Sequence, residues 1–282
     1  MRTLRIALLA LALLLAGCGE RLNPTAHDGL RIISIAPNVT EILYSLGQSN
    51  QVVGVSKFSL YPPEAAKKPS VGGTYDPNWE MIVSLQPDLV IGLNSQEEIA
   101  AQLKQLNINF LGVPHKHIQD ILQSILIIGK ACGAETEAQE LFQSLEATAL
   151  QHKDFSKDQK PRVLVCIGHD PSLSRMYIAA RGTFFDDLIN LAGGINACEQ
   201  TAIKYPEISP EGLHVINPDV VIDIVPPIEK ISADYSKVWT PYRAVIMTNQ
   251  YAFIPGPRFG LLLNDFIETI NNSTSQENSL EP

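Results

Sequence analysis

The stretch NWEMIVSLQPDLVI, residues 78–91, decides the fold, because the stretch SPEGLHVINPDVVI, residues 209–222, repeats its plan 131 positions later. In both, a residue suited to cap a helix (Asn78 or Ser209) opens a short helical segment, and a proline ends that segment. An apolar run rich in β-branched residues follows, which is typical of a buried parallel strand. The sequence therefore predicts one helix–strand unit that occurs twice.

Two further runs stand at the same spacing ahead of these stretches. RIISI (Arg31–Ile35) opens the folded region, and RVLVC (Arg162–Cys166) follows it by 131 positions. Both are short, apolar and bounded by turn residues, as buried strands are. Two strands with their helices, in the same order twice, predict an α/β protein of two Rossmann-like lobes with parallel central sheets.

A long helix is expected between the two copies, from Ala134 to Asp154. Five apolar residues fall on one face of it at helical spacing: Ala138, Leu141, Phe142, Leu145 and Ala149. Such a helix is about 30 Å long and would join the lobes as a stiff strut. The expected plan is an N-terminal lobe, an interlobe helix with its linker, a C-terminal lobe and a disordered polar tail, at residues 31–133, 134–160, 161–270 and 271–282.

The N-terminus predicts export. Residues 1–17 have two arginines, an apolar run and a small-residue exit, which together indicate a signal peptide. The apolar run Ile6–Ala16 covers about 16 Å as a helix, too little for a membrane core of about 30 Å. Leu15–Cys18 (LAGC) resembles the lipobox of bacterial lipoproteins, which implies lipidation of Cys18 and a lipidated tether over residues 18–30. We therefore expect a membrane-anchored lipoprotein facing the periplasm or the cell exterior.

Composition and motifs exclude several classes of function. The chain has 21 basic and 30 acidic residues, a net charge of −9, and no basic cluster, which argues against nucleic acid as a partner. Cys132, Cys166 and Cys198 form no CxxC pair, so we expect buried small hydrophobic residues and one disulfide at most. Nucleophile-elbow, Walker, zinc-protease and dinucleotide motifs are absent, and Asp186-Asp187 suits a helix start. We expect no catalytic residues and no enzyme.

Five segments resemble the helical-backbone (class III) periplasmic binding proteins of ABC importers for cobalamin, haem and iron siderophores. These are RIISIAPNVTEILYSLG (31–47), VVGVS with YPPEA (52–66), VGGTYDPNWEMIVSLQPDLVIG (71–92), GTFFDDLINLAGGINA (182–197) and PGPR (255–258). The resemblance implies a monomer with a shallow cleft between two lobes and little hinge motion. It also implies that one glutamate on each lobe, Glu80 and Glu211, pairs with arginines of the permease dimer. The internal repeat aligns the same two residues, although a glutamate in a first helical turn also complements the helix dipole.

Candidate ligand residues lie on loops that follow the expected strands. They are Phe58, Tyr61, Thr74 and Tyr75 in the first lobe, and His169, Arg181, Tyr205 and Arg258 in the second. Aromatic rings with a polar tip suit a large flat ligand, although aromatic residues also serve packing alone. We expect no intrinsic cofactor and a cobalt or iron chelate as ligand, cobalamin or another corrinoid first, then an iron siderophore or haem. Cobalamin-binding relatives often have tryptophan where this chain has Thr74 and Tyr205.

Two alternatives remain open. One is capture of a bare divalent metal ion, for which His115 and His117 form an HxH pair. No third ligand stands at a readable spacing, so we expect a solvated loop there and no metal site. The other is an exported α/β hydrolase, which would need a nucleophile and a base within hydrogen-bond reach.

Overall fold

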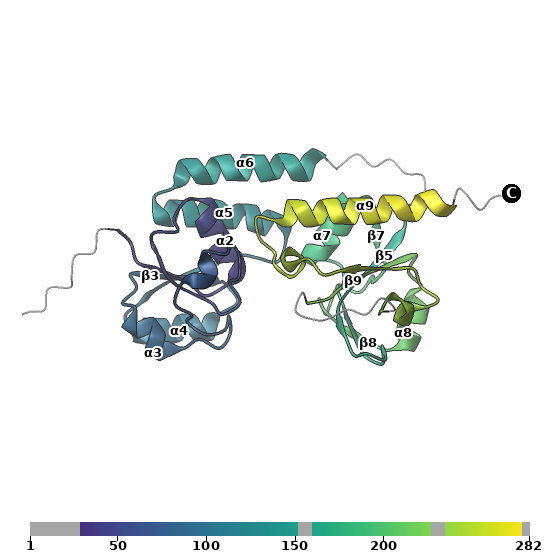
Figure 1. Ribbon diagram of the computed structural model, residues 1–282, viewed down its shortest axis with the longest axis horizontal. Helices are drawn as coiled ribbons and strands as arrows, with labels where there is room; N and C mark the ends of the chain where they lie inside the picture. The colour runs from purple at the N-terminus through teal and green to yellow at the C-terminus, as the bar shows by residue number, and fades with distance from the viewer. Residues whose placement is uncertain (1–28, 152–159, 227–234, 278–282) are drawn as a thin grey trace, which may run out of the picture. The chain divides into compact units, whose positions relative to one another are not determined.

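Two β-sheets flanked by helices make up the folded part of the chain (Figure 1). The computed structural model describes residues 29–151, 160–226 and 235–277. The expected signal peptide and Cys18 lie outside the described residues. The first sheet has the order β2-β1-β3-β4 and its strands are all parallel. Its strands are β1 (Ile32–Ser34), β2 (Val52–Val55), β3 (Leu89–Leu93) and β4 (Asn109–Val113).

The second sheet is parallel in its central strands and antiparallel at one edge. Its order is β10-β9-β5-β6-β8, and β7 also pairs with β5. Strands β10, β9 and β5 are parallel, whereas β6 is antiparallel to β5 and to β8. Residues 170–175 between β5 and β6 are too few for a parallel crossover, so the expected all-parallel sheet becomes mixed here. The strands are β5 (Arg162–His169), β6 (Met176–Ile178), β7 (Ile195–Asn196), β8 (Glu207–Ile208), β9 (Val220–Ile224) and β10 (Ala244–Met247).

The internal repeat is present in the strand register itself. Ile32 pairs with Leu89 in the first sheet, and Val163, 131 positions later, pairs with Val220 in the second. The backbone N–H of Arg31 donates to the Asp88 carboxylate at 2.7 Å, and that of Arg162 donates to Asp219 at the same distance. Four buried positions also coincide between the two cores: Ile33 with Leu164, Ile35 with Cys166, Ile82 with Leu213 and Val90 with Val221. The α/β fold with two duplicated sheets is therefore confirmed.

The helices begin where the sequence predicts capping. Asn78 Oδ1 accepts the Met81 N–H at 3.0 Å at the start of α3, and Ser209 Oγ accepts the Gly212 N–H at 3.3 Å at the start of α8. The helices are α2 (Pro37–Ser45), α3 (Trp79–Ser84), α4 (Glu97–Gln105), α5 (Ile118–Cys132), α6 (Glu135–Gln151), α7 (Phe184–Leu191), α8 (Pro210–Ile216) and α9 (Phe259–Glu277). Short 3-10 turns lie at Ala65–Lys67, Tyr235–Trp239 and Gln250–Phe253. No helix in these described ranges is both long and apolar enough to cross a membrane.

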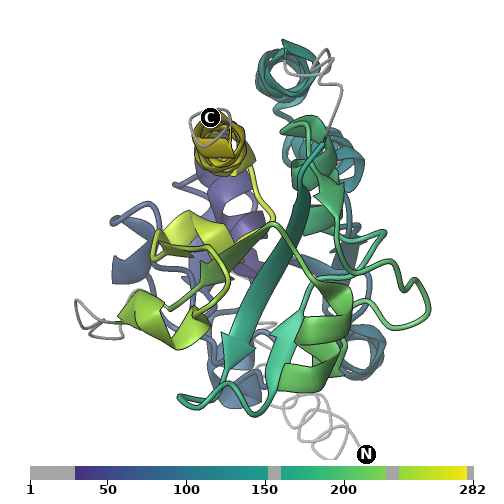
Figure 2. The same ribbon diagram turned by 90° about the vertical axis from the view of Figure 1, so that its right-hand side faces the viewer.

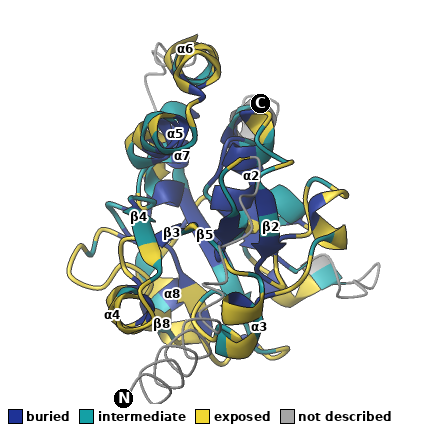
Figure 3. Cartoon of the chain, turned by 90° about the vertical axis from the view of Figure 1, so that its left-hand side faces the viewer, coloured by how far each residue is buried: buried dark blue, intermediate teal, exposed yellow. Residues whose placement is uncertain are grey.

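Helix α6 lies where the sequence predicts the helix between the lobes, and it packs on α5 as a helical hairpin. Gly133, with φ +70°, turns the chain between the two helices. At the crossing, a Cβ on Gly129 would lie 2.3 Å from the Ala138 side chain, so glycine permits the close approach. Figure 3 shows α6 mostly exposed and β3 buried, and of the expected apolar stripe only Ala138 and Ala149 are fully buried.

Helix α9 runs past the boundary expected at residue 270. The helix contacts α7, and a buried stripe at helical spacing runs along it: Phe259, Leu262, Leu263, Phe266 and Ile270. The helix continues to Glu277, so the expected end of the C-terminal lobe falls inside a helix. Figure 2, which faces the second sheet, shows α9 in yellow seen end-on, with β5 crossing the middle of the sheet.

Candidate functional site

A pocket of about 390 Å³ opens where loops from both sheets meet. His115 and Lys116 come from the loop between β4 and α5, whereas Tyr205 and Phe253 come from loops around the second sheet. Its volume is in the range of ligand sites, which run from about 300 to 1,000 Å³. The remaining lining residues are Ile167, Gly182, Thr183, Phe184, Phe185, Lys204 and Pro255.

Aromatic rings form much of the pocket wall. The rings of Phe184 and Phe185, in the first turn of α7, lie 5.4 Å apart at 64°, an edge-to-face contact. Thr183 caps this helix, because its Oγ1 accepts the Asp186 N–H at 3.2 Å. Tyr205 is 44% exposed, and its partial burial raises the pKa of its phenol, which stays neutral near pH 7. Such a wall favours a ligand with a large apolar face.

The histidine pair of the HxH sequence separates, which corrects the expected solvated loop. His115 lines the pocket, and its Nδ1 is buried without a hydrogen-bond partner in the described part of the chain. Burial, followed by the charge of Lys116, lowers the pKa of His115, so its imidazole is neutral near pH 7. The side chain was visible in the sequence, but its burial depends on residues far along the chain.

His117 is the N-cap residue of α5. Its Nδ1 lies 3.2 Å from Asp187 Oδ2 on α7, and the same oxygen accepts the Ile118 N–H at 2.9 Å. Burial raises the pKa of Asp187, opposed by the Ile118 N–H and by His117. Asp187 therefore connects the N-terminus of α5 to α7, the helix on which Asp187 lies. Across the residues that the structure describes, no three His, Cys, Asp or Glu side chains gather as a metal site would require.

Arg258 and Tyr61 are brought together, but the arginine is already paired. Its Nε and Nη2 donate to the two Glu41 carboxylate oxygens at 2.9 and 2.6 Å, and its guanidinium lies 3.8 Å from the centre of the Tyr61 ring. The Glu41 side chain is 2% exposed and that of Arg258 is 14% exposed. This pair connects α2 to the loop before α9, so the Arg258 charge is neutralised by Glu41 and is not free for a ligand.

Thr74, Tyr75 and Phe58 lie outside the pocket lining. The Gln96 amide, buried at the end of β3, accepts the Leu93 N–H and donates to the Thr74 carbonyl, which holds the loop in place. Tyr75 is 66% exposed, with its hydroxyl 3.4 Å from Ser95 Oγ. Phe58 is 53% exposed beneath the Lys57 ammonium. Tyr75 and Phe58 are therefore exposed aromatic residues outside the lining of this pocket.

His169 is engaged in a buried network and does not reach the pocket. Its Nε2 lies 3.1 Å from Asp223 Oδ2 and 2.7 Å from the Tyr235 hydroxyl, and its Nδ1 lies 2.7 Å from the Asp170 carbonyl. The Trp239 indole N–H also donates to Asp223 Oδ2, at 2.9 Å. With its side chain 5% exposed and both nitrogens occupied, His169 is not available as a metal ligand.

Of the eight expected ligand residues, Tyr205 is the one that lines this pocket. Arg181 precedes Gly182 of the lining but does not itself line the pocket, and its Nη2 lies 3.7 Å from Glu199 Oε1. Sequence reasoning missed Phe184, Phe185, Phe253 and Lys204. Phe184 and Phe185 belong to the segment GTFFDDLINLAGGINA, which the sequence singled out. The sequence did not indicate that their side chains line a pocket.

The two glutamates aligned by the repeat occupy equivalent places. Glu80 and Glu211 are exposed in the first turns of α3 and α8. Both helices lie along the same edge of the compact unit that begins at Arg31, the lower edge in Figures 1 and 3. Ser209 Oγ donates to Glu211 Oε2 at 2.7 Å, which lowers the pKa of that carboxyl. Both carboxylates therefore face solvent from one edge.

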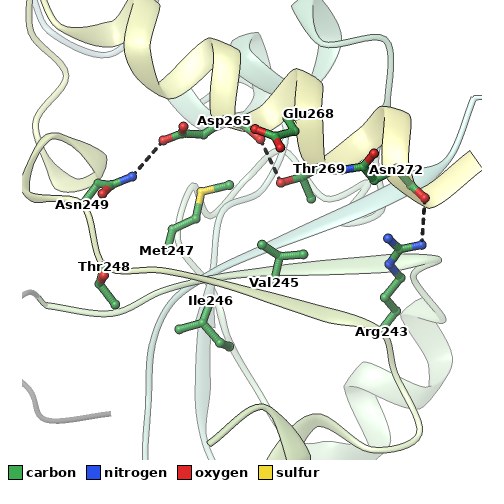
Figure 4. Close-up of a pocket in the computed structure, with 10 residues that line it drawn as sticks. All are labelled: Arg243, Val245, Ile246, Met247, Thr248, Asn249, Asp265, Glu268, Thr269 and Asn272. Carbon is green, nitrogen blue, oxygen red and sulfur yellow. Dashed lines mark hydrogen bonds between the residues drawn. The ribbon is translucent and has the colours of Figure 1, made fainter. Parts of the chain in front are cut away.

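A second pocket, of about 350 Å³, lies between β10 and α9 (Figure 4). Its polar groups bind one another: Asn249 donates to Asp265 at 3.0 Å, and Arg243 donates to the Asn272 carbonyl at 3.2 Å. It contains no residue that the sequence marked for ligand binding. The pocket lined by His115 and Tyr205 is therefore the candidate site.

Comparisons with known proteins identify similar sequences and a similar fold. A family model for periplasmic binding proteins matches residues 32–224. YvrC of Bacillus subtilis strain 168, an uncharacterized ABC transporter substrate-binding lipoprotein, is 28% identical over 96% of this chain and 97% of its own length. A vitamin B12-binding protein of Vibrio cholerae is 28% identical over 68% of this chain and 69% of its own. The solved structure of the periplasmic heme-binding protein RhuT from Roseiflexus sp. RS-1, in apo form, is 26% identical with a TM-score of 0.72, covering 87% of this chain and 99% of that one.

Proposed function

The chain belongs to the periplasmic binding protein family, and on that premise we propose that it captures a metal chelate in the pocket lined by His115 and Tyr205. It is the solute-binding protein of an ABC transporter and not an enzyme. The observation that best supports this proposal is a pocket with aromatic walls whose lining residues come from loops of both sheets. A ligand held there would contact both halves of the chain.

The proposed ligand is a cobalt or iron chelate. Relatives named for vitamin B12 and solved structures named for heme support this class. The rings of Tyr205 and Phe253 offer the flat apolar contact that a macrocycle or an aromatic siderophore requires. A chelate brings its metal already coordinated, which agrees with a pocket whose one imidazole, His115, has no carboxylate beside it in the lining.

Titration of the purified chain with cyanocobalamin, haemin and a ferric siderophore tests this proposal. We expect one of them to bind with a change in absorbance, and Tyr205→Ala to weaken it by about tenfold, equivalent to about 1.4 kcal/mol. Tyr177→Ala is the matched control, because Tyr177 is 43% exposed against 44% for Tyr205 and does not line the pocket. Absence of binding by all three chelates, in a folded protein, would overturn the proposal.

We also propose that Glu80 and Glu211 dock the loaded protein onto the permease dimer. Exposed carboxylates at the two helix starts would meet arginines and orient the encounter. The double variant Glu80→Arg, Glu211→Arg is expected to abolish chelate uptake in the native host while leaving chelate affinity unchanged. Glu137 and Glu140, exposed on α6 at the opposite edge in Figures 1 and 3, provide a control double reversal of equal charge. An equal loss in affinity, or uptake unchanged by the docking variant, contradicts this role.

Anchoring through Cys18 is the third part of the proposal. The segment LAGC and the lipoprotein relative support it. Mass spectrometry of the protein from native membranes should find the chain beginning at an acylated Cys18, and Cys18→Ala should release it from the membrane fraction. A mature chain that begins elsewhere and carries no lipid would contradict the anchor.

A further inference from the structure

The charge of the pocket lining is opposite to that of the protein. The whole chain has 30 acidic and 21 basic residues, yet the lining contains Lys116 and Lys204 and no aspartate or glutamate. A site for a cationic ligand would be expected to include a carboxylate. The lining therefore favours ligands with negative charge.

The two lysines keep their charge available. Lys204 Nζ donates to the Arg181 carbonyl at 3.0 Å, which is a neutral acceptor. Among the described residues, no salt bridge is formed by Lys204 or Lys116, and both residues are exposed at the pocket. Each ammonium can therefore turn to a ligand without breaking an ion pair.

Nearby carboxylates are committed elsewhere. Asp186 Oδ2 accepts the Gly182 N–H at 2.8 Å, and Asp187 accepts the Ile118 N–H. Glu199 lies within 3.4 Å of Arg162 and 3.7 Å of Arg181. Among the described residues, none of these acids forms a salt bridge with Lys116 or Lys204.

We propose that the pocket selects an anionic aromatic chelate, with its apolar body on the rings of Tyr205, Phe253 and Phe185 and its acidic groups at Lys116 and Lys204. The acidic groups are carboxylates of a porphyrin-type macrocycle or phenolates of a catecholate siderophore. This inference rests on the proposed chelate-binding function and narrows it. A corrinoid whose edge carries neutral amides would gain little from two ammonium groups, so it binds less well.

His115 adds a second polar contact within the same pocket. Its buried Nδ1 has no partner in the described residues, and an unpaired buried polar atom costs free energy. A donor group on the ligand would satisfy Nδ1 in the tautomer protonated at Nε2, and an acceptor group on the ligand would satisfy it in the tautomer protonated at Nδ1. This contact orients the ligand, whereas the lysines select its charge.

The test compares probes that differ in edge charge. The purified full chain is titrated with ferric mesoporphyrin IX, its dimethyl ester, the ferric complex of a triscatecholate, and cyanocobalamin, in the same detergent at low and high salt. We expect an acidic probe to bind, and the ester or cyanocobalamin to bind at least about tenfold more weakly, with the difference reduced by salt. The two acidic probes distinguish a carboxylate ligand from a phenolate ligand.

Matched variants separate local charge from net charge. Lys116→Met with Lys204→Met should weaken the acidic probe by about tenfold or more and leave the ester unchanged. Lys104→Met with Lys130→Met removes the same charge from the exposed surfaces of α4 and α5 and should leave affinity unchanged. Equal binding of acid and ester, or equal losses in both double variants, overturns the selection by charge. Tight binding of cyanocobalamin alone overturns it while the chelate function stands, and no binding by any probe overturns both.

Discussion

The first repeat, residues 31–92, and the second, residues 162–223, pair their first and last strands in the same register, β1 with β3 and β5 with β9, but differ in the chemistry at the ends of β3 and β9. Gly92 and Asp223 are equivalent positions, 131 residues apart, near the ends of β3 and β9. Beside Gly92, the neutral amide of Gln96 fills the space and holds the Thr74 loop. Asp223, fully buried, instead pairs with His169 and Trp239. The duplicated strands thus set the backbone, while the end of each sheet was adapted to its own loops.

The largest expected loss of stability follows from removing Asp223, the charged residue near the end of the second repeat. Asp223→Ala leaves His169 buried beside no carboxylate and should lower the free energy of unfolding by about 3–5 kcal/mol. Urea denaturation followed by circular dichroism measures this loss. In the double variant Asp223→Ala, His169→Ala the two losses should be less than additive, because the pair is removed together. Additive losses would show that the two side chains do not interact.

At the equivalent position in the first repeat, Gly92, we expect a larger side chain to destabilise the protein by steric crowding. A Cβ at Gly92 would lie 2.3 Å from Gln96 Oε1 and 2.7 Å from Ile35, so Gly92→Ala should cost about 1–3 kcal/mol of unfolding free energy. Gly168→Ala is the control, because a Cβ there meets no atom within 4 Å. If both glycine variants lose the same stability in urea denaturation, the close packing around Gly92 is not responsible.

The helix caps of the two repeats should behave alike. Asn78→Ala and Ser209→Ala each remove one side-chain acceptor from a helix start and should each cost about 1 kcal/mol. Thermal or urea unfolding checks both, with the exposed mid-helix variant Ser144→Ala on α6 expected to change stability by less than about 0.5 kcal/mol. A cost at one cap alone would mean that the two helices do not contribute equally.

The smallest expected effect is a pH dependence of the unfolding free energy that arises from His169 in the second repeat. Burial opposes protonation of His169, but its hydrogen bonds to Asp223 and to the Asp170 carbonyl outweigh burial and raise its pKa above 6.5. A raised folded-state pKa gives stability that is fully present below pH 6.5 and is lost as the pH rises through the folded pKa. His169→Gln should flatten this part of a urea-denaturation pH series, whereas Gln96→Met in the first repeat should not. An unchanged slope in His169→Gln contradicts the assignment.

The elements with local signals were predicted correctly. Strands β1, β3, β5 and β9, the caps at Asn78 and Ser209, and the helix at α6 each depend on neighbours in sequence, through β-branched runs, capping residues and helical spacing. The antiparallel edge of the second sheet was missed, because a strand of three residues such as β6 carries little signal of its own. The continuation of α9 was missed because polar residues can extend a helix whose earlier turns are buried.

The site was less accessible to sequence reasoning, because it depends on which partner each side chain finds. Arg258 stood in the right loop, yet Glu41, which lies 217 residues earlier, takes its charge. His169 followed a strand as expected, yet Asp223 draws it inward. His115 looked like a loop residue and lies in the pocket. No spacing in the sequence indicates that these side chains pair with one another.

The sequence by itself determined the duplication, the repeated buried strands and the family, since these follow from repeated local patterns and motif order. Only the tertiary structure decided which charges are paired and which remain available. That decision depends on burial and on distances of 3–4 Å between residues from separate elements, and these arise only when the chain is packed.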